Sequence, residues 1–572
     1  MRTLIGIITC VGFAVPVLAE TIHVPRDYPT IQAGIDAAKN GDTVLVADGV
    51  YTGKGNRDID FYGKKITVCS EYGPKDCIID CEGSENDPHR GFYFHRKEVK
   101  YSVLDGFTIK NGYVTRDSPG GGSGGGILCE SSSPTMKNLT LIGNAGSCGG
   151  GMFNDRSNPT LTSCTFNGNS ARGIGGGIVN LESSPTLTNC TFSDNSAGTF
   201  GGGMANYSSS PTVINCTFSA NSATRFSGGG MYNDRSSPTV TDCRFIGNTA
   251  VSDGGGMHNG HNSNPTVGNC RFIGNTAELG SGGMCNEYDS NPTLTNCTFN
   301  DNSRGGMFNE SSSPTLINCT FTGNKASRGG GIQNVVNSNP TVTNCTFSEN
   351  TAIFGGGMCN SSDSSPTVTN CTFTGNTASD NGGGMYNGTG EPRVTNCTFT
   401  GNTANDNGGG MCNGSGEPRV TNCTFAGNTA NDNGGGMCNE YESNPTLTNC
   451  TFNDNSHYGL YNYADSNPTV TNCIMWSDAP DEIGGSGNPV VTFSDIQGGW
   501  PGEGNIDKKP RFVSGPLGDY YLSHKKAGQD KNSRCRNAGD GTAKELGLKK
   551  YTTRTDHKKD RKRVDMGYHY PR

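Results

Sequence analysis

Pro366-Thr-Val-Thr-Asn-Cys-Thr-Phe-Thr-Gly-Asn-Thr-Ala378, followed after a short polar gap by Gly382-Gly-Gly-Met-Tyr-Asn387, is one copy of a unit that repeats through most of the chain. A proline marks the same point of each unit from Pro134 to Pro468, at steps of 25–27 residues except for one of 22 and one of 23. Thr, Val and Phe favour strands and Gly and Asn supply corners, so each unit predicts three short strands. Such a coil can bury its apolar face only by stacking on the next coil. We therefore expect an all-β, single-stranded right-handed parallel β-helix of about fourteen regular rungs.

Stacking in register places equivalent residues of successive rungs in columns along the rod. A Phe column runs from Phe166 to Phe452, and a Met or Ile column precedes an Asn column. Stacked Asn amides can hydrogen-bond along a column. We interpret the Asn and Cys columns as structural ladders, which begin with Asn154, Asn180, Asn206, Asn233 and Asn259 and with Cys164, Cys190, Cys216, Cys243 and Cys270.

The Cys column has three interpretations. Buried Cys packs like a small hydrophobic residue, which is the favoured interpretation. Neighbouring rungs are close enough for disulfides, but side chains that point the same way give poor bridge geometry. A metal ladder is least favoured, because no Cys-x-x-Cys cluster occurs. Cys412 with Cys438, and Cys69, Cys77 and Cys81 near the N-terminus, are better candidates for disulfides.

The chain divides into four parts. Residues 1–19 have the positive start, apolar run and small cleavage residues of a signal peptide, and a lipoprotein interpretation through Cys10 is weaker. We expect residues 20–120 to form an N-terminal cap with a short helix within 28–39, followed by the first coils. Residues 121–477 form the regular β-helix, and 478–572 an irregular, basic closing region. No later stretch approaches the ~18 apolar residues of a membrane helix, so we expect a secreted or cell-surface protein, with outer-membrane association left open.

The net charge of −8 is distributed unevenly. Residues 507–572 carry 18 Lys and Arg against 8 Asp and Glu. The basic end is interpreted as a solvated tail, and contact with an anionic glycan or the cell surface is the alternative. We expect an extracellular polysaccharide or a cell-surface protein as partner, and no nucleic acid.

Three motifs resemble known families. Thr30-Ile-Gln-Ala-Gly-Ile-Asp-Ala-Ala38 with Gly41-Asp-Thr-Val44 resembles the opening of pectate-lyase-like, or pectin-lyase-fold, proteins. The Phe373-x-x-Asn376 and Gly383-Gly-Met385 pieces resemble the repeats of polymorphic outer-membrane proteins. Val564-Asp-Met-Gly-Tyr-His-Tyr570 looks like the C-terminal signature of large bacterial secreted β-helix proteins. The resemblance implies a β-helix solenoid and says little about activity, because this scaffold carries many functions.

The sequence predicts no catalytic residue, no resident cofactor and no assigned metal ligand. The resemblance implies a carboxylate cluster and calcium for lyases, and several Asp-containing motifs for hydrolases, and no rung shows either pattern. Acidic residues after the Asn column could bind Ca²⁺ at one edge, although solvated corners are the favoured interpretation; they are Asp234, Glu287, Asp289, Glu310, Glu440 and Glu442. His258 and His261 are interpreted as surface residues.

One column between the Met and Asn columns should point outward and could contact a glycan or a protein. Its candidate contact residues are Phe153, Tyr232, His258, Phe308, Tyr386 and Tyr461. We therefore favour a structural or adhesive, glycan-binding surface protein. A polysaccharide lyase or glycoside hydrolase is the alternative, and a passenger domain needing a secretion partner is a weaker third hypothesis.

The two short steps predict local recesses in the rod. The rungs that begin at Pro292 and Pro445 lose part of the loop before the third strand. We call the recess at residues 302–305 the first notch and the recess at residues 455–458 the second notch.

Overall fold

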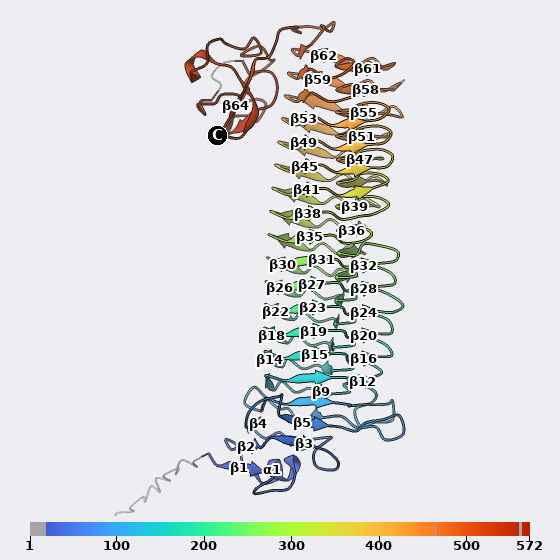
Figure 1. The fold of residues 1–572 in the computed structure, drawn as a ribbon, viewed down its shortest axis with the longest axis vertical. Coiled ribbons are helices and arrows are strands. Elements are labelled where there is room, and N and C mark those ends of the chain that lie inside the picture. The colour runs from blue at the N-terminus through green and yellow to red at the C-terminus, as the bar shows by residue number, and fades with distance from the viewer. Residues whose placement is uncertain (1–18, 464, 560–562) are drawn as a thin grey trace, which may run out of the picture.

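The computed structural model describes residues 19–463, 465–559 and 563–572, so the predicted signal peptide, with Cys10, lies outside the described residues except for Ala19. The chain winds into one long rod of stacked parallel coils (Figure 1). Three parallel sheets run along it, which confirms the predicted all-β parallel β-helix. They extend from β1 (Thr21–Val24) to β62 (Val490–Thr492), from β3 (Gly49–Tyr51) to β63 (Asp495–Ile496), and from β6 (Phe92–Phe94) to β61 (Ile483–Gly485).

Each regular rung contributes one strand to each sheet, as the repeat predicts. In the rung of Pro366 these are β44 (Thr367–Thr369), β45 (Thr372–Thr374) and β47 (Met385–Asn387). Equivalent residues of neighbouring rungs face each other, for example Phe347 and Phe373. The backbones of successive coils approach closely at the Gly-Gly pair before the third strand. A Cβ on Gly229 would lie 2.3 Å from the carbonyl oxygen of Thr249, so no larger residue fits there.

The interior of the rod is filled by the predicted columns. Phe rings from Phe166 to Phe452 stack at centroid separations of 4.6–5.1 Å with nearly parallel planes. The Met or Ile column and the Cys column are buried beside them. Stacked rings at this spacing supply apolar burial and ring contact together. The Cys ladder, Cys164, Cys190, Cys216, Cys243 and Cys270 included, is thus part of the apolar core, as the favoured interpretation predicts.

Two buried Asn ladders run the length of the array. In the predicted ladder, Asn154 Nδ2 donates to Asn180 Oδ1 at 2.9 Å, and Asn180, Asn206, Asn233 and Asn259 continue the chain at 2.8 Å. The second ladder, from Asn144 to Asn455, follows the Phe column and was not predicted as a ladder. There each side-chain amide before Asn455 donates hydrogen bonds both to the next Asn side chain and to a backbone carbonyl of the preceding rung, as in Asn248 Nδ2 to Phe218 O at 2.9 Å. These hydrogen bonds satisfy amide and carbonyl groups at the corners of the coils that would otherwise be buried without partners.

The N-terminal end is closed by the helix α1 (Ile31–Ala37), shorter than the predicted range. Thr30 caps it, with its Oγ1 accepting from the amide of Ala33 at 3.2 Å. Ile31 and Ile35 are fully buried against the first coil. The helix thereby covers the end of the core, as expected for a solenoid. Within the described residues, no helix has the length and apolar character that crossing a membrane requires.

The coils continue beyond residue 477, where the sequence suggested that they end. Strands β61, β62 and β63 add a further coil to the three sheets. The chain after this coil folds back beside the last rungs (Figure 1), and contains the antiparallel pair β64 (Phe512–Gly515) and β65 (Gly518–Leu522). Asn422 bonds this region twice, accepting from the amide of His569 at 2.6 Å and donating to its carbonyl at 2.8 Å.

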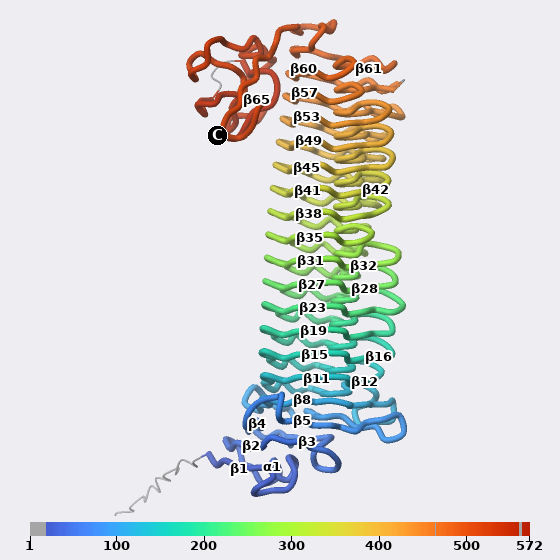
Figure 2. The backbone as a smooth tube through the Cα atoms, in the orientation of Figure 1, coloured from blue at the N-terminus to red at the C-terminus, as the bar shows by residue number. Residues whose placement is uncertain are grey.

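An interruption in a fourth, narrow strip of strands marks the position of the first notch. Two-residue strands pair from β12 (Ala145–Gly146) to β32 (Thr276–Ala277) and resume from β42 (Thr351–Ala352) to β54 (Thr429–Ala430). The gap contains the shortened rung of Pro292, in which only Ser303 remains to bridge to Lys325. The outline of the coils steps inward at this level, near β35 (Thr298–Asn300) (Figure 2).

Candidate functional site

The first notch holds a cavity of about 280 Å³. Its floor comes from two neighbouring strands of the third sheet, β33 (Met284–Glu287) and β36 (Met307–Glu310). Its walls come from the loops of the rungs on either side. The lining residues are Asp253, Leu279, Gly280, Glu287, Arg304, Phe308, Glu310, Ala326, Ser327, Arg328 and Gln333. Because the intervening loop is four residues shorter than in the rung before it, these walls stand apart and leave the floor accessible.

The cavity gathers three carboxylates. Glu287 and Glu310 are direct partners on adjacent strands, and Asp253 approaches from the loop of an earlier rung. Burial and the charge of Asp253 raise the pKa of Glu287 to about 7. Burial and the charge of Glu310 also raise the pKa of Asp253. Crowded, partly desolvated carboxylates of this kind cannot all ionise freely, which is typical of functional sites.

Two guanidinium groups and one aromatic ring complete the cavity. Arg304 lies in the shortened loop, and Arg328 comes from the following rung, with its guanidinium 5.8 Å from the Phe354 ring centre. Phe308 is half-buried on the cavity floor. The site therefore offers hydrogen-bond acceptors, donors and an apolar surface within one recess.

The predicted aromatic contact column lies on the outer face of the third sheet, but the expectation that it is exposed is wrong for two of its residues. Tyr232 and His258 are each 5% exposed. The loop before the third strand folds over the column, and the Phe200 ring lies 4.4 Å from that of Tyr232. The other four candidates are half-buried, namely Phe153, Phe308, Tyr386 and Tyr461. Only Phe308 lines the notch cavity, and a contact role for the column stays a prediction.

The acidic corner residues do not form one edge. Asp234 and Glu440 are buried, and Asp289 and Glu442 are exposed on turns. The structure brings Glu287 and Glu310 together and leaves the other four apart. The sequence did not predict Asp253, Arg304 and Arg328 as site residues. The one available signal was the short repeat step, which marks the loop that contains Arg304.

A group of potential metal ligands adjoins the cavity. His258 and Cys285 are register partners on β29 (Met257–Gly260) and β33, and Glu287 follows two residues later on the same face. One ligand atom from each lies within 4.8 Å of the others. His261, in contrast, lies on an exposed turn, where its ring stacks on Tyr288 at 4.9 Å.

Cys412 and Cys438 lie in the same outer-face column as Tyr386 but are buried there, and all the cysteines of the described residues are free thiols, including Cys69, Cys77 and Cys81. Burial raises the pKa of Cys77 to about 12. None of the candidate disulfides among these five residues is therefore formed in the structure.

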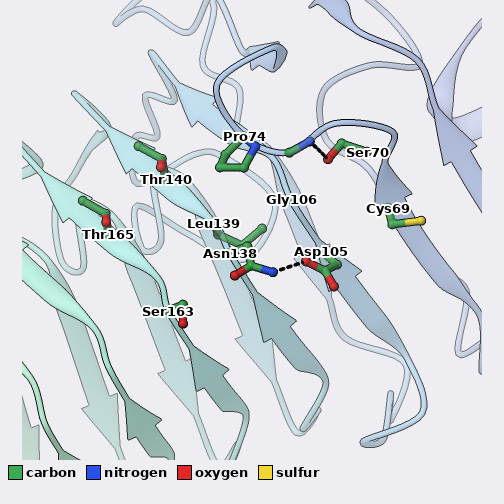
Figure 3. Close-up of a pocket in the computed structure, with 11 residues that line it drawn as sticks. Cys69, Ser70, Pro74, Asp105, Gly106, Asn138, Leu139, Thr140, Ser163 and Thr165 are labelled. Atoms are coloured by element: carbon green, nitrogen blue, oxygen red, sulfur yellow. Dashed lines mark hydrogen bonds between the residues drawn. The ribbon is translucent and has the colours of Figure 1, made fainter.

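Three further cavities lie on the N-terminal coils. One of about 610 Å³ opens where the first sheet turns into the second (Figure 3). Its carboxylate, Asp105, accepts a 2.8 Å hydrogen bond from Asn138. A cavity of about 870 Å³ is lined by Lys65, Lys97 and Lys100, and one of about 560 Å³ by Arg116 and Arg172. None of the three gathers several carboxylates, so the first notch is the strongest candidate.

Comparison with solved structures gives distant likenesses only. The N-terminal fragment of gene product 12 of bacteriophage phi29 is 10% identical, with 83% of this chain and 90% of that chain covered and a TM-score of 0.37. A mannuronic-acid-specific polysaccharide family 6 lyase from human gut microbiota is 14% identical, with coverage of 75% and 86% and a TM-score of 0.30. A GH87 α-1,3-glucanase catalytic domain is 13% identical, with coverage of 76% and 69% and a TM-score of 0.29.

No curated protein sequence matches the chain. The family described as the right handed beta helix region matches residues 56–200, 174–282, 276–399 and 370–496, which together span most of the chain. These matches coincide with the coils that build the rod. The chain therefore belongs to the right-handed β-helix family.

Proposed function

We propose that this protein is an extracellular glycan-binding rod, and that the first notch holds one unit of a neutral polysaccharide. The observation that carries the proposal is the convergence of Glu287, Glu310, Arg304, Arg328 and Phe308 on one recess of the array. Carboxylates accept hydrogen bonds from sugar hydroxyl groups, guanidinium groups donate to sugar oxygens, and an aromatic ring can cover an apolar sugar face. A recess of a few hundred cubic ångströms suits a unit of this size.

The charge of the recess favours a neutral sugar. Three carboxylates face two guanidinium groups, and Arg328 also lies against Phe354. An anionic sugar would have to enter beside partly buried carboxylates, which repel it at short range. The remaining rungs supply length, so that the notch stands well away from both ends of the rod.

The test uses the full mature chain on a glycan array, followed by calorimetric titration of the best ligand. Phe308→Ala should weaken binding at least about tenfold, because the loss of about 1.4 kcal/mol corresponds to that factor. Phe153→Ala is the matched control, since Phe153 occupies the same column position in a rung far from the cavity. Absence of glycan binding, or equal effects of the two substitutions, would contradict the proposal.

Glycoside hydrolysis is a second candidate, favoured by the pKa of Glu287. A carboxyl group with a pKa of about 7 can be protonated at neutral pH while a neighbouring carboxylate is ionised, as sugar hydrolysis requires. Neutral glucans and polyuronates should be incubated with the protein, with and without Ca²⁺, and new reducing ends measured. Turnover of a neutral glucan that is lost in Glu287→Gln and kept in Phe153→Ala would support this role. No turnover would rule against it.

A further inference from the structure

We propose that His258, Cys285 and Glu287 form a binding site for a zinc-type divalent metal ion at the edge of the first notch. The three potential ligand atoms lie within 4.8 Å of one another. His258 Nε2 is 3.9 Å from Glu287 Oε2, and Cys285 Sγ is 3.4 Å from Glu287 Oε1. Ligands of one tetrahedral zinc ion lie roughly 3–4 Å apart, given metal–ligand bonds of about 2.0–2.3 Å. Small side-chain adjustments would therefore place all three around one ion.

The β-helix register creates this cluster. His258 and Cys285 are direct neighbours on adjacent parallel strands, and strand alternation puts Cys285 and Glu287 on the same face. Neighbouring rungs carry Tyr232 and Phe308 at the same column position. Among the described residues, this is the one group of three such side chains close enough to share an ion.

The second observation is the unsatisfied imidazole of His258. The side chain is 7% exposed, and its Nδ1 is buried without a hydrogen-bond partner among the described residues. Its Nε2 lies too far from Glu287 for a hydrogen bond. The Tyr232 ring stacks on the imidazole at 5.1 Å with an interplanar angle of 8°, which holds the orientation of the ring. A metal ion would accept the lone pair of Nε2, the ring nitrogen that faces Glu287, whereas Nδ1 would carry the proton.

The electrostatics of the cluster also suit a cation. Burial lowers the pKa of His258 to about 3, so the ring is neutral, which is the form that binds metals. Burial raises the pKa of the Cys285 thiol and, together with Asp253, that of Glu287. A divalent ion would favour the ionised thiolate and carboxylate at the place where the protein alone disfavours them.

The ligand set indicates the class of metal. Nitrogen, sulfur and one carboxylate are typical of zinc, whereas calcium takes six to eight oxygen ligands. Three protein ligands leave a fourth position, and the cavity lined by Glu287 is the side on which an exogenous ligand could fill it. The inference does not rest on glycan binding. The metal site is incompatible with the proposed glycoside hydrolysis, because a bound ion would keep Glu287 ionised and hydrolysis requires its protonated form.

The test is a titration of the chelator-treated full mature chain with Co²⁺ as a spectroscopic probe for Zn²⁺. We expect one equivalent to bind with a thiolate-to-cobalt charge-transfer band, and Zn²⁺ to displace it. Cys285→Ser should abolish the band, and Glu287→Gln should weaken Co²⁺ affinity at least about 100-fold. Cys359→Ser is the matched control, because Cys359 is buried at the same column position but belongs to no such cluster.

Each outcome decides the matter. A band that survives Cys285→Ser, or is lost equally in Cys359→Ser, would overturn the site, as would the absence of stoichiometric binding. Circular dichroism of each variant checks that the β-helix is intact. If Cys285→Ser fails to fold, Glu287→Gln provides the test, because it changes only a half-buried side chain. Glycan titration of the metal-free protein is separate, so failure of glycan binding leaves the metal result interpretable.

Discussion

Single Asn residues at the corners join neighbouring coils through buried hydrogen bonds. The side chain of Asn248 makes four hydrogen bonds inside the rod: its Nδ2 donates to Phe218 O and Asn275 Oδ1, and its Oδ1 accepts hydrogen bonds from the backbone amide and the side chain of Asn221. The repeat revealed the Asn after the Met column as a ladder but not this one. The Phe-x-x-Asn spacing was visible in the sequence, whereas the inward direction of the Asn side chain depends on the corner geometry.

Asn248→Ala should destabilise the surrounding rungs by about 3 kcal/mol, because it leaves buried donors and acceptors without partners. Hydrogen exchange of the neighbouring amides is the appropriate measurement, since a solenoid can open locally. Asn405→Ala, on the exposed surface, should have little effect. Equal protection in both variants would contradict a role for the buried ladder.

The last Asn of this ladder ends on a carboxylate. Asp478 Oδ1 accepts from the amide and the side chain of Asn455 at 2.7 and 2.9 Å, and burial raises the pKa of Asp478 to about 7. The folded state therefore prefers the protonated acid. Its stabilising contribution is fully present below about pH 4 and is lost as the pH rises through about 7.

Asp478→Asn should reduce the fall in stability between pH 5 and 9 by a few kcal/mol, because the amide keeps the acceptor oxygen and cannot ionise. Thermal unfolding across this range is the measurement, and exposed Asp481→Asn is the control. The nearby Glu482, whose pKa is also raised by burial and by Asp478, should leave some pH dependence. An unchanged pH profile in Asp478→Asn would show that Asp478 titrates normally.

At the scale of elements, the repeat predicts the strands and their register because every rung has the same sequence pattern. It also predicts the first notch from the step of 22 residues. It does not predict the composition of the notch cavity, because Asp253 and Arg328 come from neighbouring loops whose paths are irregular. The loop of Phe200, in an earlier rung, covers Tyr232, which strand alternation alone placed on the surface.

Lengthening the shortened loop should close the cavity. Insertion of a copy of residues 277–280 between Ser303 and Arg304 restores the loop length of the preceding rung. Surface loops tolerate such insertions at small entropic cost, so folding should persist while glycan affinity falls at least about tenfold. The same insertion between Ser456 and His457, in the second notch, is the control. Calorimetric titration that finds equal affinity in both variants would place the binding surface elsewhere.

At the scale of the whole molecule, the closing region lies alongside the rod instead of extending it. Asn396 bonds Tyr551, Asn422 bonds His569, and Asn449 Nδ2 donates to Asp565 O at 3.0 Å. These three Asn occupy one left-handed corner position of successive rungs. The sequence marked the region as irregular but could not show this contact, which joins residues more than a hundred positions apart.

Asn422→Gly should loosen the closing region, because it removes two hydrogen bonds while keeping a residue that accepts the left-handed corner. Limited proteolysis should then release C-terminal fragments several times faster. Asn344→Gly is the control, since Asn344 has the same backbone conformation at an exposed corner. If both variants are cleaved alike, the Asn422 contacts contribute nothing measurable to docking.

The coiled path of the chain has a mechanical consequence. Each regular rung stores 26 or so residues within a rise of about 4.8 Å, yet the same segment spans roughly 90 Å when extended. Under tension between its two ends, the rod would lengthen by unfolding one coil after another. The unfolding of each coil would be resisted by a similar set of backbone hydrogen bonds, Asn amide hydrogen bonds and stacked rings. The molecule would thus extend in steps of nearly equal length and dissipate mechanical work at each step.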